Sequence, residues 1–214
     1  MTPLELSIEQ VYKEFADVRK PHQVFGCSCC TDPQHLIRLA AQPLRSIGSH
    51  DIGFYGFKAV TTIGDGRDYL YFLPRILELS VGSDCFPDLA ITAGKIAATN
   101  WQQWPPSRRK AVVCLFREII ERILHDNDFD RIGDWLCAAT ILDFDIVPIL
   151  ARLQQLPAAV LSYFEENAQL LRQGKLSHWQ GNLPNSNHDA IVNWLKSDAV
   201  LKILRDTYCY QWYP

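Results

Sequence analysis

The chain has 214 residues, of which 48% are hydrophobic and 21% charged, so it is long enough to bury a substantial core and has an ordinary globular composition. Its formal net charge of −3 is too small to create a field that attracts nucleic acid or an anionic lipid surface. We therefore expect neither a nucleic-acid partner nor a membrane partner.

The N-terminal sequence MTPLELSIEQ lacks the basic and apolar segments of a signal peptide, and no apolar run approaches the ~18 residues of a membrane helix. We expect a cytoplasmic protein whose cysteines stay reduced. Seven cysteines, an odd number, also argue against a closed disulfide framework. For five of them we expect the role of small buried hydrophobic residues: Cys29, Cys85, Cys114, Cys137 and Cys209.

Helical periodicity dominates the N-terminal part of the chain. Apolar residues at helical spacing predict a helix over Ser7–Lys20, and Asp32 before Pro33 predicts the start of a second helix. Ser49 caps a third helical segment, which a glycine-rich turn at residues 64–66 ends. The next helix follows that turn directly.

The C-terminal part of the chain continues the helical pattern. A polar loop, SHWQGNLPNSNH, precedes a final helical pair between about residues 188 and 206. The other predicted helices cover residues 106–125, 131–142, 144–155 and 157–172.

These patterns predict the fold class. Alternating β-branched runs bounded by turns are nearly missing, so the sequence indicates an all-α fold of about ten short helices. We expect an irregular bundle or a helical-repeat-like array that forms one domain over residues 1–214. The segment 188–214 is the candidate for a C-terminal subdomain.

The stretch TTIGDGRDYLYFLPRILEL carries four polar side chains that allow two interpretations. They either bind a ligand together, or Asp68 caps a helix that Pro74 kinks while Arg75 and Glu78 form an intrahelical ion pair. The stretch has no phosphate-loop pattern and no nucleophile–base pair, which favours the second interpretation. The candidate binding residues are Asp65, Asp68, Arg75 and Glu78.

The segment HQVFGCSCCTDPQH places Cys27 and Cys30 at C-x-x-C spacing with Cys29 between them. Structural zinc takes four thiolate or imidazole ligands, and one such motif supplies two. A second metal-binding motif is missing, so a fourth ligand would have to come from His22, His35 or a distant residue. We therefore expect no tightly bound metal and no cofactor.

Trp101 and Trp104, beside two prolines, also have two interpretations: an aromatic binding surface, or a cap on the core at a helix–helix corner. The second is the commoner use of such a pair. No serine-hydrolase elbow and no H-E-x-x-H motif is present, so the sequence predicts no catalytic residue.

Two stretches, GCSCCTDP and PLRSIGSHDIGFYGFKAVTTIGDGRDYLYFLPRILEL, together resemble a widespread family of uncharacterised bacterial proteins over residues 26–80. Members of that family show C-x-x-C, KA-x-TT-x-G-D and FLPR-[IL]-LEL patterns. The additional cysteine in CSCC departs from the pattern. Some members of that family look as though their genes lie beside polymorphic toxin genes, and the resemblance therefore implies an immunity-like role.

Two function classes follow. The first is a non-enzymatic interaction protein, most concretely an immunity protein that binds and neutralises a cognate bacterial toxin. The second is a small-molecule or metal-dependent enzyme with a site around residues 22–35 and 61–79. A pocket that joins those two segments would favour the enzyme, whereas a broad exposed face of aromatic and acidic residues would favour the interaction protein.

Overall fold

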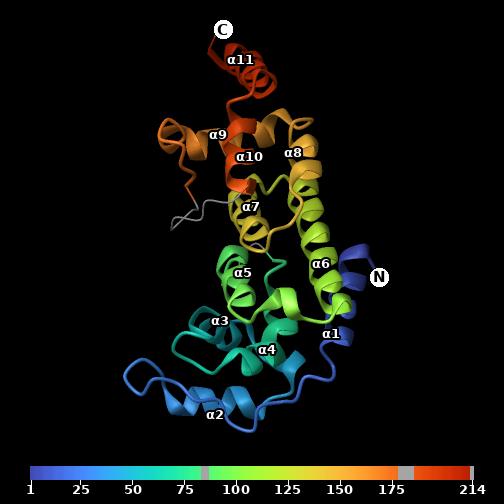
Figure 1. The fold of residues 1–214 in the computed structure, drawn as a ribbon, viewed down its shortest axis with the longest axis vertical. Helices are drawn as coiled ribbons and strands as arrows, with labels where there is room; N and C mark the ends of the chain where they lie inside the picture. The colour runs from blue at the N-terminus through green and yellow to red at the C-terminus, as the bar shows by residue number, and fades with distance from the viewer. Residues whose placement is uncertain (83–86, 178–185, 213–214) are drawn as a thin grey trace. The chain divides into compact units, whose positions relative to one another are not determined.

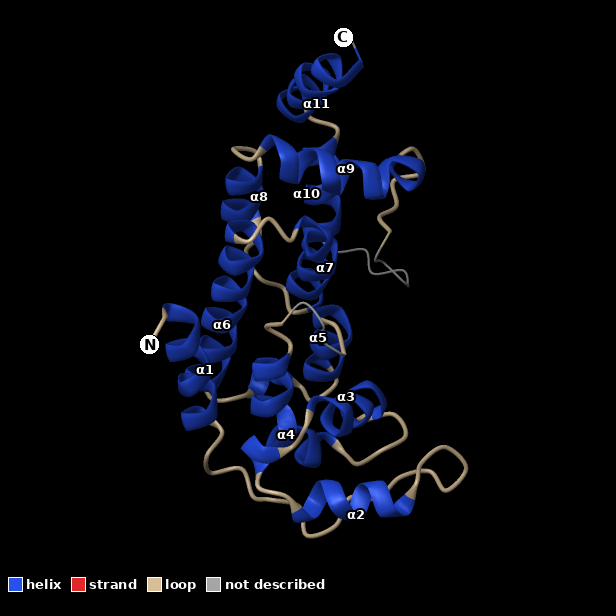
Figure 2. Ribbon diagram, turned by 180° about the vertical axis from the view of Figure 1, so that it is seen from behind, coloured by secondary structure: helices blue, strands red, loops and turns tan. Residues whose placement is uncertain are grey.

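The computed structural model describes residues 1–82, 87–177 and 186–212, with side chains through Thr207 in the last range. In these ranges the chain forms eleven α-helices, three short 3-10 helices and no strand, which confirms the predicted all-α fold. Figure 1 follows the helices along the chain, and Figure 2 shows that helices and loops make up the drawn fold.

The chain divides into two compact units, Met1–Ile119 and Ile120–Pro214. The boundary falls inside one long helix, α6, which spans Pro106–His125 as the sequence predicted. The expectation of one domain over residues 1–214 stays a prediction.

Helix α4 is the central element of the first unit, because it packs against α1, α3 and η1. Its apolar face is fully buried and carries Tyr69, Phe72, Leu73 and Leu77. Helix α3 also packs against α2 and α5. The elements of this unit before α6 are α1 (Pro3–Glu14), α2 (Pro33–Ala41), η1 (Leu44–Ser46), α3 (Ser49–Lys58), α4 (Gly66–Leu79), α5 (Leu89–Ala97) and η2 (Trp101–Gln103).

The first helix begins earlier than the sequence analysis predicted. Its N-cap is Thr2, whose hydroxyl accepts the backbone N–H of Glu5 while the Glu5 carboxylate accepts the backbone N–H of Thr2. This reciprocal capping box, followed by a proline at the first helical position, starts the helix four residues before Ser7. Helix α1 ends at Glu14 rather than Lys20.

In the second unit, helix α7 is buried from Ile132 to Thr140, including its polar Asp134. A helix that is buried on all faces has a core position rather than a surface one. Val160, Val200 and Leu204 form a further apolar cluster where α9 packs against α11. The elements of this unit after α6 are η3 (Phe129–Arg131), α7 (Ile132–Ile141), α8 (Val147–Leu153), α9 (Pro157–Leu171), α10 (Ser186–Leu195) and α11 (Asp198–Trp212).

None of the helices in the described ranges combines the length and the apolar character that crossing a lipid bilayer requires.

Candidate functional site

The start of α4 accounts for two of the predicted binding residues. Asp65, not Asp68, is the N-cap, because its Oδ1 accepts the backbone N–H groups of Arg67 at 2.7 Å and Asp68 at 3.0 Å. Asp68 completes a capping box by accepting the backbone N–H of Asp65 at 3.4 Å. Partial burial raises the pKa of Asp68. Both carboxylates therefore stabilise the N-terminus of α4. The prediction that Asp68 is the N-cap is wrong, because the cap is Asp65, three residues earlier.

The other two predicted binding residues join α4 to its neighbours. Arg75 Nη1 donates to Glu78 Oε2 at 2.6 Å, which is the intrahelical pair that the spacing predicts, and Arg75 Nε donates to the carbonyl of Ile47 at 2.9 Å. The same Glu78 oxygen accepts the hydroxyl of Tyr12 on α1 at 2.6 Å. Helix α4 continues through Pro74 to Leu79 as one helix. Arg75 and Glu78 thus hold α1 and the loop after η1 against α4.

A second ionic contact extends this network to the surface. Arg45, in η1, makes a bidentate pair with Glu9 on α1, with N–O distances of 2.8 and 2.7 Å. Its guanidinium carbon lies 3.7 Å from the centre of the Tyr12 ring, a cation–π contact. The hydrogen bond from Arg45 lowers the pKa of Glu9, and both side chains remain about half exposed.

These contacts border a pocket of about 420 Å³ in the first unit. Its walls come from α1 and the turn after it, from η1 and the residue before it, and from the middle of α4. Most of the lining is apolar or aromatic, and Arg45 is the charged residue among its lining side chains. The lining residues are Tyr12, Phe15, Ala16, Val18, Pro43, Leu44, Arg45, Tyr71 and Pro74.

Sequence reasoning did not find this pocket. Tyr12 lies in the apolar pattern that predicts the first helix, but its partner Glu78 is 66 residues away in the sequence. Arg45 and Glu9 are 36 residues apart. Local spacing carries no signal for contacts at such separations.

The predicted tryptophan pair lies in the core of the first unit. Trp101 and Trp104 are only 6% and 7% exposed, and their rings meet edge to face with centroids 6.4 Å apart. Trp104 also packs edge-on against Phe15 at 5.4 Å. Arg108 also contacts Phe15, with its guanidinium carbon 5.1 Å from the Phe15 ring centre. The structure therefore favours the core-capping interpretation over a binding surface.

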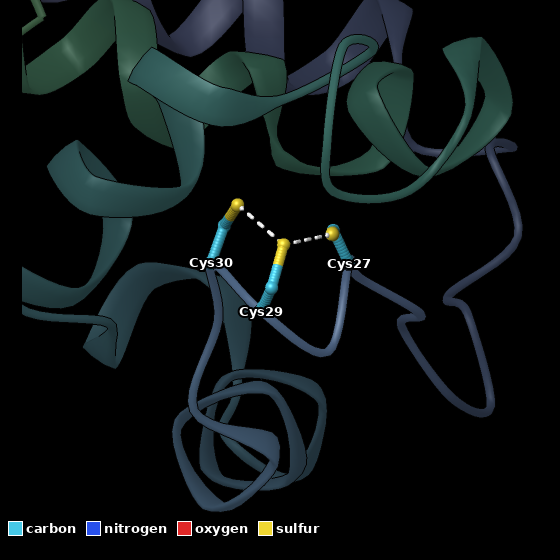
Figure 3. A group of neighbouring side chains, drawn as sticks. All are labelled: Cys27, Cys29 and Cys30. Carbon is cyan, nitrogen blue, oxygen red and sulfur yellow. Dashed lines mark hydrogen bonds between the residues drawn. The ribbon is translucent and has the colours of Figure 1, made fainter.

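The three cysteines of the CSCC motif lie together on an exposed turn before α2. Sγ of Cys29 is 2.8 Å from Sγ of Cys27 and 3.1 Å from Sγ of Cys30. Figure 3 shows the three sulfur atoms turned toward one another. The prediction that Cys29 is a buried packing residue is therefore wrong.

The remaining cysteines follow the prediction in part. Cys137 is buried and Cys114 is partly buried. Cys85 and Cys209 lie outside the residues whose side chains the structure describes.

The thiols of the CSCC turn differ in acidity. Hydrogen bonds from the Cys29 thiol, and then from the backbone N–H of Cys29 and the Cys30 thiol, lower the pKa of Cys27. The side-chain hydrogen bonds of Cys29 with Cys27, and then with Cys30, raise the pKa of Cys29 to about 12. Cys27 is therefore the thiol of this pair that ionises first.

The turn that ends α3 supports the cysteine turn. The backbone N–H of Cys27 donates to the carbonyl of Thr62 at 2.9 Å, and the N–H of Gly64 donates to the carbonyl of Phe25 at 2.7 Å. Lys58 Nζ donates to the carbonyl of Cys30 at 2.7 Å. The segments 22–35 and 61–79, which the sequence analysis considered together, therefore meet through backbone hydrogen bonds.

The two flanking histidines have other contacts. His35 is buried, with Nδ1 3.4 Å from Asp51 Oδ1 and its ring edge-on against Phe54. His22 Nε2 accepts a hydrogen bond from Arg19 at 2.8 Å. Among the described residues, the close group of metal-ligating side chains consists of the three cysteines alone.

No family model matches this chain, and neither does any curated protein or solved structure compared with it. Function is therefore inferred from the geometry of the pocket and of the cysteine turn, together with the motif resemblance.

Proposed function

We propose that this protein works by binding a partner protein, and that the pocket between α1, η1 and α4 receives an apolar side chain of that partner. The observation that supports this proposal is the lining of the pocket. Three aromatic residues, Tyr12, Phe15 and Tyr71, line it, and the exposed Glu9–Arg45 pair lies next to it. Phe15 is buried and Tyr12 and Tyr71 are partly buried, whereas Glu9 and Arg45 are exposed. An aromatic pocket beside exposed charged residues is typical of an anchor site in a protein interface.

The hydrogen bonding of the lining favours a protein side chain over a polar small molecule. Small-molecule sites usually present a few polar groups that are free to orient the ligand. Here the Arg45 guanidinium is already paired with Glu9, and the Tyr12 hydroxyl is already bonded to Glu78. An apolar side chain gains contact area in such a pocket without displacing these bonds.

The pocket does not support the alternative enzyme. A site for that enzyme would join residues 22–35 to residues 61–79. This pocket takes Tyr71 and Pro74 from the second segment and no residue from the first. The four polar residues proposed for ligand binding are occupied in capping and in joining helices.

The motif resemblance gives the partner its class. We propose that the protein is a cytoplasmic bacterial immunity protein and that its partner is a cognate toxin, which it blocks by covering a functional surface. A standard interface takes about 800 Å² from each partner, so the pocket would be the anchor of a larger contact surface.

The test takes as candidate toxin the product of a large gene adjacent to this one. Its C-terminal region is expressed in a heterologous host with and without this protein, and the purified pair is examined by size-exclusion chromatography. Restored growth and a stoichiometric complex are expected. Absence of both toxicity and complex formation, together with turnover of a small molecule by the purified chain, would favour the enzyme.

A filled-pocket variant tests the docking site itself. Ala16 is exposed and lines the pocket, so Ala16→Trp should occupy the space and weaken binding by at least about 10-fold, or 1.4 kcal/mol. The matched control is Ala158→Trp, at an exposed position of α9 that is not among the residues lining the pocket. Equal affinities for the two variants would show that the partner docks elsewhere.

A further inference from the structure

We propose that Cys27, Cys29 and Cys30 bind one soft metal ion through three thiolates, and that monovalent copper is the preferred ion. This inference concerns the cysteine turn and does not depend on the proposed partner. The pocket and the cysteine turn share no residue.

The positions of the sulfur atoms suit a common ligand. All three lie within 4.8 Å of one another, and all three side chains are exposed, so an ion reaches them from solvent. Thiolates about 2.3 Å from one ion lie about 3.8–4.0 Å apart, by the geometry of tetrahedral or trigonal coordination. Rotation of the exposed side chains about χ1 supplies the small opening that this requires.

Core packing does not explain these cysteines. Free cysteine is among the most frequently buried residues, and its usual role is that of a small hydrophobe. Cys27, Cys29 and Cys30 are exposed, whereas Cys137 in the second unit is buried. Three thiols that are exposed and turned toward one another point to a ligand-binding role.

The backbone holds the turn in place without an ion. The carbonyl of Cys27 accepts the N–H groups of Cys30 and Thr31, both at 3.0 Å, and the Thr31 hydroxyl at 2.7 Å. The hydrogen bonds to Thr62 and from Lys58 fix the turn to the end of α3. Metal binding therefore requires little ordering of the chain. It loses less conformational entropy than binding to a disordered segment with the same cysteines would.

The adjoining turn is itself tightly constrained. The carbonyl of Lys58 accepts the backbone N–H groups of Thr62 at 3.0 Å and Ile63 at 3.2 Å. Val60, which lies between Lys58 and Thr62 in the sequence, has a φ of +65°, and this is unusual for a β-branched residue. Its backbone N–H donates to the carbonyl of Ile63. Such strain persists where the surrounding structure over-determines the backbone, and it is frequent beside ligand sites.

The number of ligands selects the ion. Structural zinc takes four protein ligands, and in the described part of the chain the group ends at three. His35 is buried against Asp51 and Phe54, so it is not placed to supply a fourth. Thiolates are soft ligands that bind both Cu(I) and zinc. Three sulfur ligands complete a trigonal shell for Cu(I), whereas zinc would still need a water as its fourth ligand.

Nearby positive charge offsets the charge of such a complex. Three thiolates and one Cu(I) carry a net charge of −2. The ammonium group of Lys58 is bonded to the carbonyl of Cys30 and favours an anionic centre at this position. The N-terminus of α2 also follows the turn, but the carboxylate of Asp32 already caps it.

The experiment uses the full chain, reduced and kept anaerobic. It is titrated with Cu(I) against the chromophoric chelator bicinchoninate, and separately challenged with an equal mixture of Cu(I) and Zn²⁺. The expected result is one copper per chain, with X-ray absorption showing three sulfur ligands and no fourth ligand. Copper should remain bound in the presence of zinc.

Serine variants separate the three-thiolate site from a two-thiolate one. Cys29→Ser removes the central thiol and should weaken copper binding by at least about 100-fold, beyond the 10–100-fold typical of a lost outer-shell contact. Cys114→Ser, at a partly buried cysteine of α6, is the matched control and should bind like the wild type. Far-UV circular dichroism checks that each variant is folded.

Three outcomes would overturn the inference. A folded wild-type chain that retains no copper has no site. Equal binding by Cys29→Ser and the wild type reduces the site to the Cys27 and Cys30 pair. Retention of zinc with four ligands in preference to copper refutes the choice of ion. None of these outcomes affects the partner-binding proposal, which is tested on the pocket.

Discussion

The hydroxyl of Tyr12 on α1 donates a 2.6 Å hydrogen bond to the carboxylate of Glu78 on α4. The bond is partly buried. The pKa of Tyr12 is raised chiefly by burial of its hydroxyl and secondarily by this hydrogen bond to Glu78. Since Glu78 also accepts from Arg75, the three side chains form one connected contact between two helices.

Tyr12→Phe should lower the free energy of unfolding by about 1.5 kcal/mol, because a hydrogen bond to a charged group contributes roughly 1.5–3 kcal/mol. The estimate is at the low end because Glu78 keeps its bond from Arg75. Urea unfolding followed by circular dichroism measures the change. Tyr71→Phe, another partly buried tyrosine of the same unit, is the control, and an equal loss in both variants would contradict the assigned role of the Tyr12 hydroxyl.

The capping box of α4 predicts an order of effects at its two aspartates. Asp65→Ala should cost about 0.5–2 kcal/mol, because it leaves two backbone N–H groups without their acceptor. Asp68→Ala should cost less, since its bond to the Asp65 N–H is long and burial already disfavours its charge. Thermal unfolding of both variants decides the order. A larger loss for Asp68→Ala would restore Asp68 as the principal cap.

Gly64 allows the chain to turn from α3 into α4, and its replacement should be costly. Its φ is +60°, and an added Cβ would lie 2.9 Å from Asp68 Oδ2. Gly64→Ala should destabilise by at least about 1–2 kcal/mol, the cost of the left-handed conformation for a residue with a Cβ.

Gly94 is the matched comparison for Gly64, because it lies inside α5 and an added Cβ would have no atom within 4 Å beyond the backbone of its own helix and its chain neighbours. Gly94→Ala should stabilise by roughly 0.5–1 kcal/mol, through better helix propensity. Chemical denaturation of the two variants should therefore show opposite signs. Two changes of the same sign would refute the conformational explanation.

The thiols of the cysteine turn should differ in their pH dependence of alkylation. A thiolate reacts with iodoacetamide and a thiol does not. A lowered pKa keeps Cys27 ionised at lower pH, whereas Cys29, with a pKa of about 12, stays protonated at neutral pH. We expect peptide mass spectrometry at pH 7 to show Cys27 modified before Cys29. The measurement is made in the Cys114→Ser variant. Equal rates of alkylation at Cys27 and Cys29 would contradict the assigned difference in pKa.

Several elements could be predicted from the sequence because their signals are local. The run 106–125 has apolar residues at helical spacing, and α6 has these same bounds. The Arg75–Glu78 pair needs only a separation of three residues on one helix. Asp32 before Pro33 placed the start of α2, since the cap and the first helical position are adjacent in sequence.

Competing local signals explain the boundary errors. Thr2 and Ser7 both begin plausible capping boxes, and the structure uses the first, which has proline at the next position. Asp65 and Asp68 are both good caps, and the structure uses Asp65 as the cap and Asp68 as its reciprocal partner. Helix α5 was not among the predicted segments, although Asp88 caps it.

The sequence by itself determined that the chain is helical, because the period of its apolar residues depends only on near neighbours. Tertiary structure decided which side chains meet: Tyr12 with Glu78, Arg45 with Glu9, and the cysteine turn with Thr62. It also decided that Trp101 is buried while Cys29 is exposed. The physical reason is that burial and long-range contact depend on how separate helices pack, and residue type and spacing do not specify that packing.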